Sequence, residues 1–175
     1  NLSAADTMKT YAIMAGQIER LKSYVSSMNT LQRLEDVPIV RKQLISSDFI
    51  AMLNDTAEMI CKNKNLSISD KTAAISLCVD PEIVLQVFEN LLSNAARYAK
   101  SSISIQYVVE NDTFSITVTD DGSGFDDTTL KSATNPFYTT EKKYNSGQHL
   151  GLGLNICKIL CERHNGSIIL SNGIT

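Results

Sequence analysis

The chain has 175 residues, a formal net charge of −3 and 43% hydrophobic residues, a length and apolar fraction that suit one packed domain with at most a short extension. Its lysines and arginines are scattered instead of clustered, so nucleic-acid binding is not expected. It has no run of 18 apolar residues and no signal peptide at its start, so we expect no membrane contact by this part of the protein.

The first predicted element is a long helix over residues 5–34. Its apolar residues step by 4, 3, 4 and 3, as in a heptad seam: Met14, Ile18, Leu21, Val25 and Met28. Such a seam must pack against another helix, within the chain or in a partner subunit. Pro38 and the charged stretch before it end this helix, which predicts a boundary between residues 1–37 and a domain over residues 38–175.

Short elements follow the boundary. A strand is predicted at residues 41–45 and an amphipathic helix over residues 47–62. The inner face of that helix should carry Phe49, Ile50, Leu53, Ala57 and Ile60. Two further strands are predicted within "NLSIS" and "AAISLCV", residues 65–69 and 73–79.

The next helix should begin at Pro81, because Asp80 supplies an N-cap acceptor and proline suits the first helical position. Alternating apolar residues on either side of "ENDT", residues 110–113, predict a β-hairpin. Residues 125–150 are polar, irregular and too long for an ordinary connection. Loops of this kind are usually lids or binding loops.

The last predicted helix runs from Gly151 to about His164, with Gly166 as its stop, and a strand, "SIILS", follows at residues 167–171. The strand patterns are mostly antiparallel. The predicted fold class is therefore α+β, a two-layer sandwich of a mixed, largely antiparallel sheet with helices on one face, preceded by one long helix.

The four cysteines form no CxxC pair: Cys61, Cys78, Cys157 and Cys161. Buried reduced thiols act as small hydrophobic groups, and we favour that role over a metal or redox function. The pattern favours a reducing, cytoplasmic location.

A polar stripe marks the helix that begins at Pro81. Gln86, Asn90, Asn94 and Arg97 are spaced by 4, 4 and 3 residues, so they share one face. A solvated face normally carries glutamate or lysine instead. Because carbonyl-type oxygens suit Mg²⁺ and arginine suits phosphate, we favour a site for a metal and an anion over a solvated face.

Two glycine-containing segments add to the stripe. In "TDDGSGF", Gly122 and Gly124 allow close approach of a ligand, and Asp120 can accept a hydrogen bond from an amino group, although ordinary turns share this composition. In "GLGLNI", residues 151–156, a helix begins whose free N–H groups suit phosphate. This segment is neither a Walker motif nor GxGxxG after a strand, so those two nucleotide folds are disfavoured.

These three segments, in this order and with "NPFYTTE" before the third, resemble the ATP-binding catalytic domain of sensor histidine kinases. That domain belongs to a wider group with gyrase, mismatch-repair and heat-shock chaperone ATPases. The resemblance covers about residues 40–172 and implies a Bergerat-type ATP-binding fold, usually with one more strand after "SIILSNGIT", so the last strand is expected to be truncated. The helix at residues 5–34 resembles the second helix of the family's dimerisation and phosphotransfer hairpin.

The resemblance also implies roles for single residues. Asn94 is similar to the asparagine that holds Mg²⁺, and Asn90 to its companion one turn earlier. Arg97 stands where a basic residue contacts phosphate, and Tyr98 where an aromatic ring packs on adenine. Asp120 resembles the aspartate that accepts the adenine amino hydrogen.

Other positions that match the family's nucleotide site lie in the glycine segments and the long loop. Gly122 and Gly124 are expected to shape the adenine pocket, and Phe137 to anchor a lid. Lys142 and Lys143 are lid charges that could reach phosphate, or solvated lysines. The segment facing the phosphates is expected to consist of Gly151, Leu152, Gly153 and Leu154.

Two features depart from the family's pattern. Chaperone and gyrase ATPases carry a glutamate base where this chain has Asn90, and Glu89 should point about 100° away, so plain ATP hydrolysis is disfavoured. The only histidines, His149 and His164, do not resemble an acceptor, and His164 fits a helix-cap or dipole role. We expect the acceptor helix to precede Asn1, together with any sensor and membrane segments.

The resemblance therefore implies an ATP- and Mg²⁺-binding catalytic fragment of a two-component sensor histidine kinase. It would transfer the ATP γ-phosphoryl group to a histidine outside this chain, in the cytoplasmic part of a membrane-anchored bacterial receptor. The implied partners are a second copy, through the N-terminal helix, and a response regulator receiver domain. Two alternatives stay open: an ATP-gated conformational ATPase of the same superfamily, and a degenerate kinase that acts as a scaffold.

Overall fold

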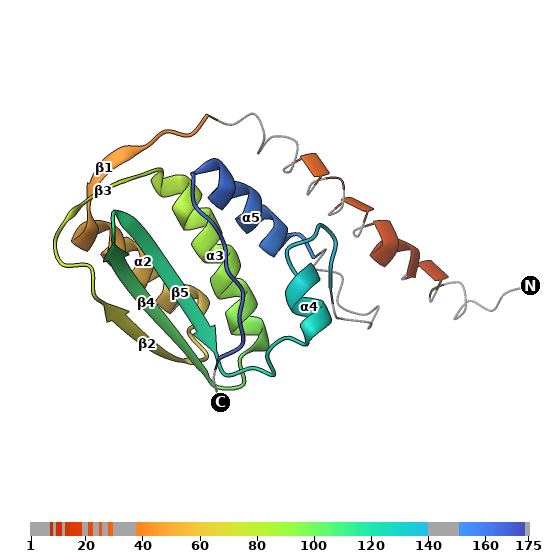
Figure 1. Cartoon of the computed structure of the whole chain (residues 1–175). Helices are drawn as coiled ribbons and strands as arrows, with labels where there is room; N and C mark the ends of the chain where they lie inside the picture. Colours follow the sequence, from red (N-terminus) through yellow and green to blue (C-terminus); the bar gives the residue numbers. More distant parts are fainter. Residues whose placement is uncertain are drawn as a thin grey trace, which may run out of the picture.

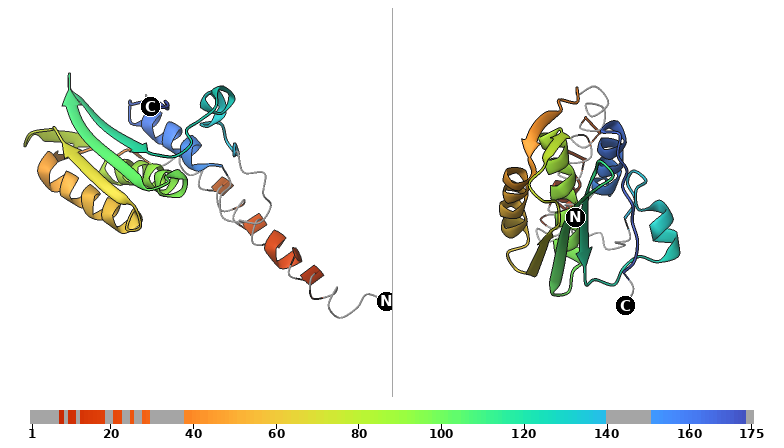
Figure 2. Two further views of the ribbon diagram at one scale, coloured as in Figure 1. Left: turned by 90° about the horizontal axis from the view of Figure 1, so that it is seen from below. Right: turned by 60° about the vertical axis from the view of Figure 1, so that its left-hand side comes forward.

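The computed structural model describes residues 38–139 and 151–173 continuously, and scattered residues between 8 and 29. Strands form one layer, and α2, α3 and α5 lie against it in the other (Figures 1 and 2). The elements are, in chain order, β1 (Lys42–Ile45), α2 (Ser46–Ile60), β2 (Asn65–Asp70), β3 (Ser76–Val79), α3 (Pro81–Tyr98), β4 (Ser102–Glu110), β5 (Thr113–Asp120), α4 (Asp127–Ser132) and α5 (Gly153–Arg163). The predicted α+β fold class is confirmed.

The described strands form two sheets. In the larger sheet β4 lies between β2, to which it is parallel, and β5, to which it is antiparallel. The β4–β5 hairpin closes through Asn111 and Asp112, which both have positive φ (49° and 58°), as a two-residue type I′ turn requires. In the smaller sheet β1 pairs antiparallel with β3. The sheet is thus mixed and largely antiparallel, as predicted.

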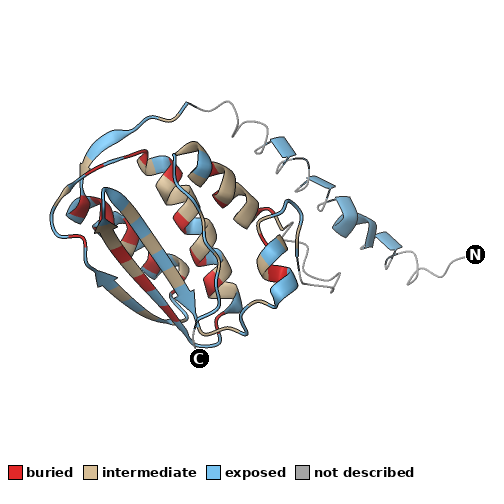
Figure 3. Cartoon of the chain, viewed as in Figure 1, coloured by how far each residue is buried: buried red, intermediate tan, exposed pale blue. Residues whose placement is uncertain are grey.

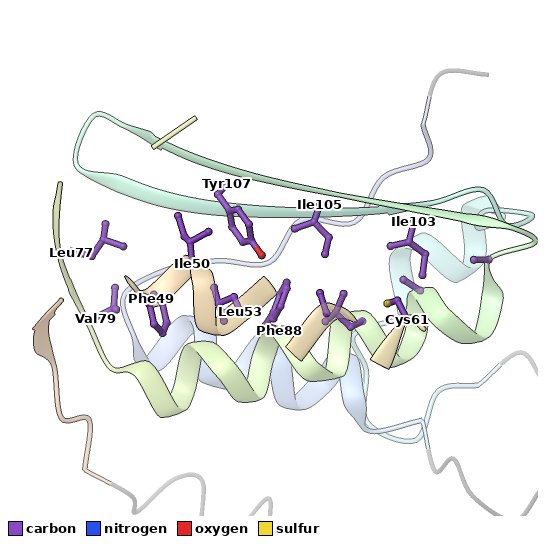
Figure 4. Packing of buried hydrophobic residues seen from close by; sticks show 14 residues of the cluster. Phe49, Ile50, Leu53, Cys61, Leu77, Val79, Phe88, Ile103, Ile105 and Tyr107 are labelled. Carbon is purple, nitrogen blue, oxygen red and sulfur yellow. The ribbon is translucent and has the colours of Figure 1, made fainter. Parts of the chain in front are cut away.

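The hydrophobic core lies between the larger sheet and the helices (Figures 3 and 4). Alternate residues of β4 point into it, and Tyr107 is fully buried between Phe88 of α3 and Phe114 of β5. The Tyr107 hydroxyl donates a hydrogen bond to Asn54 Oδ1 (3.0 Å), so its one polar atom is satisfied. The predicted inner face of α2 is confirmed, since Phe49, Ile50, Leu53 and Ala57 are buried and Ile60 packs against them.

Helix α3 begins as the sequence predicts. One carboxylate oxygen of Asp80 accepts hydrogen bonds from the N–H groups of Glu82 (3.1 Å) and Ile83 (3.3 Å). The other oxygen accepts from the N–H of Val40 (2.7 Å). A single side chain therefore caps α3 and fixes the incoming chain to it.

Helix α5 ends in a Schellman motif. The Gly166 N–H donates to the Cys161 carbonyl (2.8 Å) and the Asn165 N–H to the Glu162 carbonyl (3.1 Å). The helix ends at Arg163, and the left-handed residue that follows its C-cap is Asn165 (φ 62°) instead of the predicted Gly166. His164 is the C-cap, which confirms its predicted capping role.

His164 also joins α5 to the start of α3. Its Nε2 accepts a hydrogen bond from the Asp80 N–H (2.8 Å), and its carbonyl accepts one from Arg41 (2.8 Å). Partial burial, and next the nearby Arg41 charge, lower the pKa of His164 below 6.5, although Asp80 opposes this shift. The imidazole is therefore held neutral in the folded protein.

This neutral histidine predicts that stability depends on pH. The unfolded chain takes up the His164 proton more readily than the folded chain, so the stabilisation is complete above about pH 6.5 and is lost as pH falls through the lower folded-state pKa. We expect urea unfolding to show a free energy of unfolding that declines from pH 7 to 5. The decline should flatten in His164→Gln and persist in the control His149→Gln. A slope that is unchanged in His164→Gln would contradict this.

Two predicted features near the C-terminal half need correction. Residues 125–150 are not wholly irregular, because α4 forms within them, and Asp126 caps this helix by accepting from the Thr129 N–H (2.6 Å). Hydrogen bonds from the Thr128 hydroxyl and then from the Thr129 N–H lower the pKa of Asp126 to about 2. The predicted strand at 167–171 is wrong: residues 166–173 pair with no strand among the described residues. The segment is held instead by Asn172, whose side chain binds the N–H (2.8 Å) and carbonyl (2.7 Å) of Phe125.

The N-terminal helix is described only in part. All five seam residues have helical backbone and are exposed, from 37% for Met28 to 64% for Leu21. The division into residues 1–37 and 38–175 stays a prediction. Within the described part of the chain, no helix combines the length and apolar character needed to cross a bilayer.

All four cysteines are free thiols. Cys61 and Cys157 are buried, and burial raises the pKa of Cys157 to about 12, so these two behave as the predicted small hydrophobic groups. Cys78 on β3 differs, because it is exposed.

Candidate functional site

Helix α3, which carries the polar stripe, lies beside α5 in the helical layer (Figure 1). Its four residues are partly buried, whereas Glu89 beside them is exposed. The amide of Asn90 donates to the Gln86 carbonyl (2.9 Å), which leaves the Asn90 amide oxygen available. This half-covered position argues against the solvated-face alternative, which would place the stripe in water.

The start of α5 meets the two asparagines. A Cβ atom added to Gly153 would lie 3.2 Å from Asn90 Oδ1 and 4.0 Å from Asn94 Nδ2. Leu152, the residue before the helix, supplies no side-chain cap. The N-terminal end of α5 therefore faces the amide stripe at contact distance, and it brings together two sequence motifs that are about 60 residues apart in the chain.

The Asp120 motif lies at the opposite end of α3 from the Asp80 cap. The Gly122 N–H donates to Asp120 Oδ1 (2.8 Å), and a Cβ atom on Gly122 would lie 2.7 Å from the Tyr98 carbonyl oxygen. The Asp120 carboxylate is exposed at the end of β5. Its second oxygen can therefore accept a hydrogen bond from a ligand.

Tyr98 and Arg97 form the last turn of α3. The Arg97 guanidinium carbon lies 5.5 Å from the centroid of the Tyr98 ring, and this ring is 45% exposed. An aromatic face and a cation thus lie at the same helix end as Asp120, since Gly122 packs on the Tyr98 backbone.

Asp121 stabilises this end of the site, although no sequence pattern distinguished it from Asp120. Its carboxylate accepts hydrogen bonds from the Ser101 N–H (2.9 Å) and hydroxyl (2.6 Å). These bonds, with others from Ser101 and Ser102, hold the pKa of Asp121 well below its usual range. The charged carboxylate ties the end of β5 to the turn after α3.

Phe137 and Gly151 lie on either side of residues 140–150. This segment, which includes Lys142, Lys143 and His149, lies outside the described residues. Phe137 adopts a left-handed backbone (φ 62°) and is 38% exposed. Gly151 is also left-handed (φ 67°), and its Cα lies so close to the Tyr138 carbonyl that no Cβ would fit. The two flanks therefore touch.

The structure thus brings the predicted residues together in two groups along α3. Asn90, Asn94 and Gly153 meet in the middle, and Arg97, Tyr98, Asp120 and Gly122 gather at one end. Gly124 is set apart, next to Asn172, a residue that no sequence pattern singled out. Amide oxygens, a cation and a helix N-terminus suit a phosphorylated ligand, and Asp120 suits a base with an amino group.

A metal ion at this site would need ligands from its substrate. Among the described residues, no group of three or more histidine, cysteine, aspartate or glutamate side chains could hold a metal. Asparagine oxygens fit Mg²⁺, which usually binds few protein groups and keeps waters and substrate phosphates.

The chain is similar to known proteins in sequence. Residues 79–174 match the family described as "Histidine kinase-, DNA gyrase B-, and HSP90-like ATPase". The sensor histidine kinase SpaK of Bacillus subtilis is 28% identical over 169 residues, which are 94% of this chain and 36% of SpaK. The sensor histidine kinase YvrG of Bacillus subtilis is 30% identical over 87% of this chain and 28% of its own length. The chain thus spans about a third of these relatives.

Solved structures share the fold. The catalytic domain of histidine kinase ThkA, in a nucleotide-free form, superposes with a TM-score of 0.61 at 20% identity over 71% of this chain and 82% of that one. Full-length ShkA in complex with AMPPNP gives a TM-score of 0.67 at 17% identity, covering 93% of this chain and 35% of ShkA. At these identities the likeness establishes the fold alone.

Proposed function

This chain belongs to the family of histidine kinase-, DNA gyrase B- and HSP90-like ATPases, as an ATP-binding catalytic domain, and from that premise we propose that it transfers the γ-phosphoryl group of ATP to a histidine outside this chain. The observation that carries the proposal is the contact of Gly153 with Asn90 and Asn94, which places a helix N-terminus opposite two amide groups. Free backbone N–H groups suit phosphate and amide oxygens suit Mg²⁺, so a triphosphate with Mg²⁺ suits a surface that carries both.

The proposed roles follow the chemistry of each side chain. Asn94, with Asn90 as its companion, holds a Mg²⁺ ion that neutralises phosphate charge when bound. Arg97 contacts phosphate, as does the backbone of residues 151–154, because guanidinium and free N–H groups both donate to phosphate oxygens.

Selectivity for adenine is proposed to come from Asp120. Its exposed carboxylate accepts a hydrogen from the amino group of adenine, whereas guanine presents a carbonyl oxygen at that position. The exposed Tyr98 ring offers a flat apolar surface for the base. Gly122, packed between Asp120 and the Tyr98 backbone, belongs to the same pocket, whereas Gly124 lies next to Asn172.

The site favours phosphoryl transfer over water activation. Asn90 has an amide and cannot take a proton from water, and Glu89 is exposed, outside the partly buried stripe. Transfer to an incoming histidine nitrogen depends mainly on placement and charge neutralisation, which the stripe, Arg97 and the start of α5 provide. This disfavours the conformational-ATPase alternative.

The partners of the whole protein are also proposals. The exposed seam, from Met14 to Met28, pairs with a second copy in the full-length protein, because an apolar helical strip is unstable in water. A response regulator receiver domain then takes the phosphoryl group from the histidine. By analogy with its sensor-kinase relatives, we place the domain in the cytoplasm.

We expect calorimetric titration with Mg²⁺ to show binding of ATP and ADP and no binding of GTP. Asp120→Asn should weaken ATP binding by about 10- to 100-fold, since a hydrogen bond to a charged group contributes about 1.5–3 kcal/mol. Asp127→Asn, an equally conservative change in the exposed first turn of α4, is the control and should leave affinity unchanged.

Three other outcomes would count against the proposal. GTP binding equal to that of ATP would remove Asp120 from its role. Sustained ATP turnover by this chain would support the conformational ATPase. Failure of the folded wild-type protein to bind any nucleotide would support the scaffold.

A further inference from the structure

Next to residues 140–150, the structure shows two side-chain hydrogen bonds between residues that the sequence did not assign to nucleotide binding. The Asn155 side-chain amide of α5 donates a hydrogen bond to the Thr134 carbonyl (3.0 Å). The hydroxyl groups of Tyr138 and Thr129 are hydrogen-bonded at 3.1 Å, which ties the flank after α4 back to α4 itself. We call Thr129, Thr134, Tyr138 and Asn155 the brace.

The brace encloses a strained stretch of backbone. Phe137 lies between Thr134 and Tyr138 and has a left-handed conformation (φ 62°), which is unfavourable for a residue with a side chain. Such a conformation persists only where the surrounding contacts impose it. The Tyr138 N–H also donates to the Asn135 carbonyl (3.3 Å), and the two side-chain bonds hold the chain on either side of this turn.

The strained turn also fixes the position of Gly151. The Tyr138 carbonyl lies against the Gly151 Cα, and Gly153, two residues further on, touches Asn90. Asn155 is the third residue of α5 and is therefore rigidly connected to Gly153. The Asn155 side chain donates its hydrogen bond to the Thr134 carbonyl and does not cap α5, which has no side-chain cap.

We propose that Asn155, with Tyr138, is a positioning residue: the brace sets the place of Gly151 and Gly153 relative to Asn90 and Asn94. It touches no nucleotide and acts through the helix start. Its effect on affinity rests on the proposed function, while its effect on the position of the glycines does not.

The test uses amide spectra of the nucleotide-free protein followed by titration. Glycine amides fall in a separate region of a ¹H–¹⁵N NMR spectrum, and the chain has only eight glycines. In Asn155→Ala and Tyr138→Phe, the Gly151 and Gly153 signals should shift or broaden, while those of Gly122 and Gly173 stay in place. Lys158→Ala, one turn further along α5 and equally part-buried, is the control and should move none of them.

Asn155→Asp separates the hydrogen bond from packing, because it keeps the side-chain shape and removes the donor. It should disturb the same two glycines as Asn155→Ala. Calorimetry should then show ADP bound about threefold to tenfold more weakly by Asn155→Ala and Tyr138→Phe, the range expected for one net hydrogen bond, and unchanged by Lys158→Ala.

Unmoved Gly151 and Gly153 signals in these variants would overturn the proposal, as would moved signals with unchanged ADP affinity. If the wild-type protein binds no nucleotide, the proposed function fails, and the spectra alone still decide whether the brace positions the glycines. Asn155→Ala and Tyr138→Phe each remove one hydrogen bond of a part-buried side chain, so we expect both variants to fold. Thermal unfolding checks that they do.

Discussion

Replacing Gly151 by alanine is expected to weaken ATP binding by more than about tenfold. The left-handed backbone of Gly151 costs an alanine roughly 1–2 kcal/mol, and the new Cβ would collide with the Tyr138 carbonyl. This obstacle is backbone, not the movable end of a side chain, so the chain around residue 151 must shift. Since Gly153 is two residues further along the chain and touches Asn90, we expect the shift to reach the amide stripe.

Calorimetric titration with ATP measures this effect, and Gly166→Ala is its matched control. Gly166 also lies at an end of α5, but a Cβ there would make only an ordinary contact, 3.5 Å from the Cys161 carbonyl, and its φ is not in the left-handed range. The control should bind ATP as the wild type does. Equal ATP affinity in Gly151→Ala and the wild type would show that the start of α5 does not hold phosphate.

Replacing Phe88 by alanine is expected to lower the free energy of unfolding by about 3–5 kcal/mol. The Phe88 ring is fully buried, with its centroid 6.3 Å from that of Tyr107, and it fills the space between α3 and the larger sheet (Figure 4). Alanine would leave a cavity that the surrounding residues cannot fill, because the neighbouring core side chains come from rigid strands and helices.

Chemical denaturation measures the loss, with Glu89→Ala as its control. Glu89 is the next residue of the same helix and is exposed, so its replacement should change stability by less than about 0.5 kcal/mol. A loss below about 1 kcal/mol in Phe88→Ala would mean that this part of the core repacks easily, contrary to the close packing described above.

The fold was largely predictable where a local signal determines the backbone. Asp80 before Pro81 marks a helix start through capping chemistry, and the Asn111–Asp112 turn follows from two residues that tolerate positive φ. The strand expected at residues 167–171 shows the limit of such signals. Alternating apolar residues indicate which side chains face the core, but not whether a neighbouring strand lies within hydrogen-bonding distance.

The helix α4 was missed although its signal was present. Asp126 before "DTTL" is a capping pattern, but the polar character of residues 125–150 suggested a loop throughout. Length and composition are weaker evidence than a cap in such segments.

The candidate site was predictable as far as one helix carries it. The 4, 4 and 3 spacing places the four residues from Gln86 to Arg97 on one face whatever the tertiary structure is. The contact of Gly153 with Asn90, by contrast, depends on how α5 packs, and periodicity contains no such information. Asn155 and Asn172 were missed for the same reason, since their partners are backbone atoms distant in sequence.

Asp80 connects the start of the domain to helix α3. The carboxylate holds the Val40 N–H at one end of an 18-residue helix, which spans about 27 Å, and Asn94 stands near its other end. Because of this bond, a displacement of the chain at Val40 would move the start of α3, the helix that carries the amide groups. The sheet is not part of this connection. The first residues of the domain are thus mechanically connected to its ligand-facing side chains.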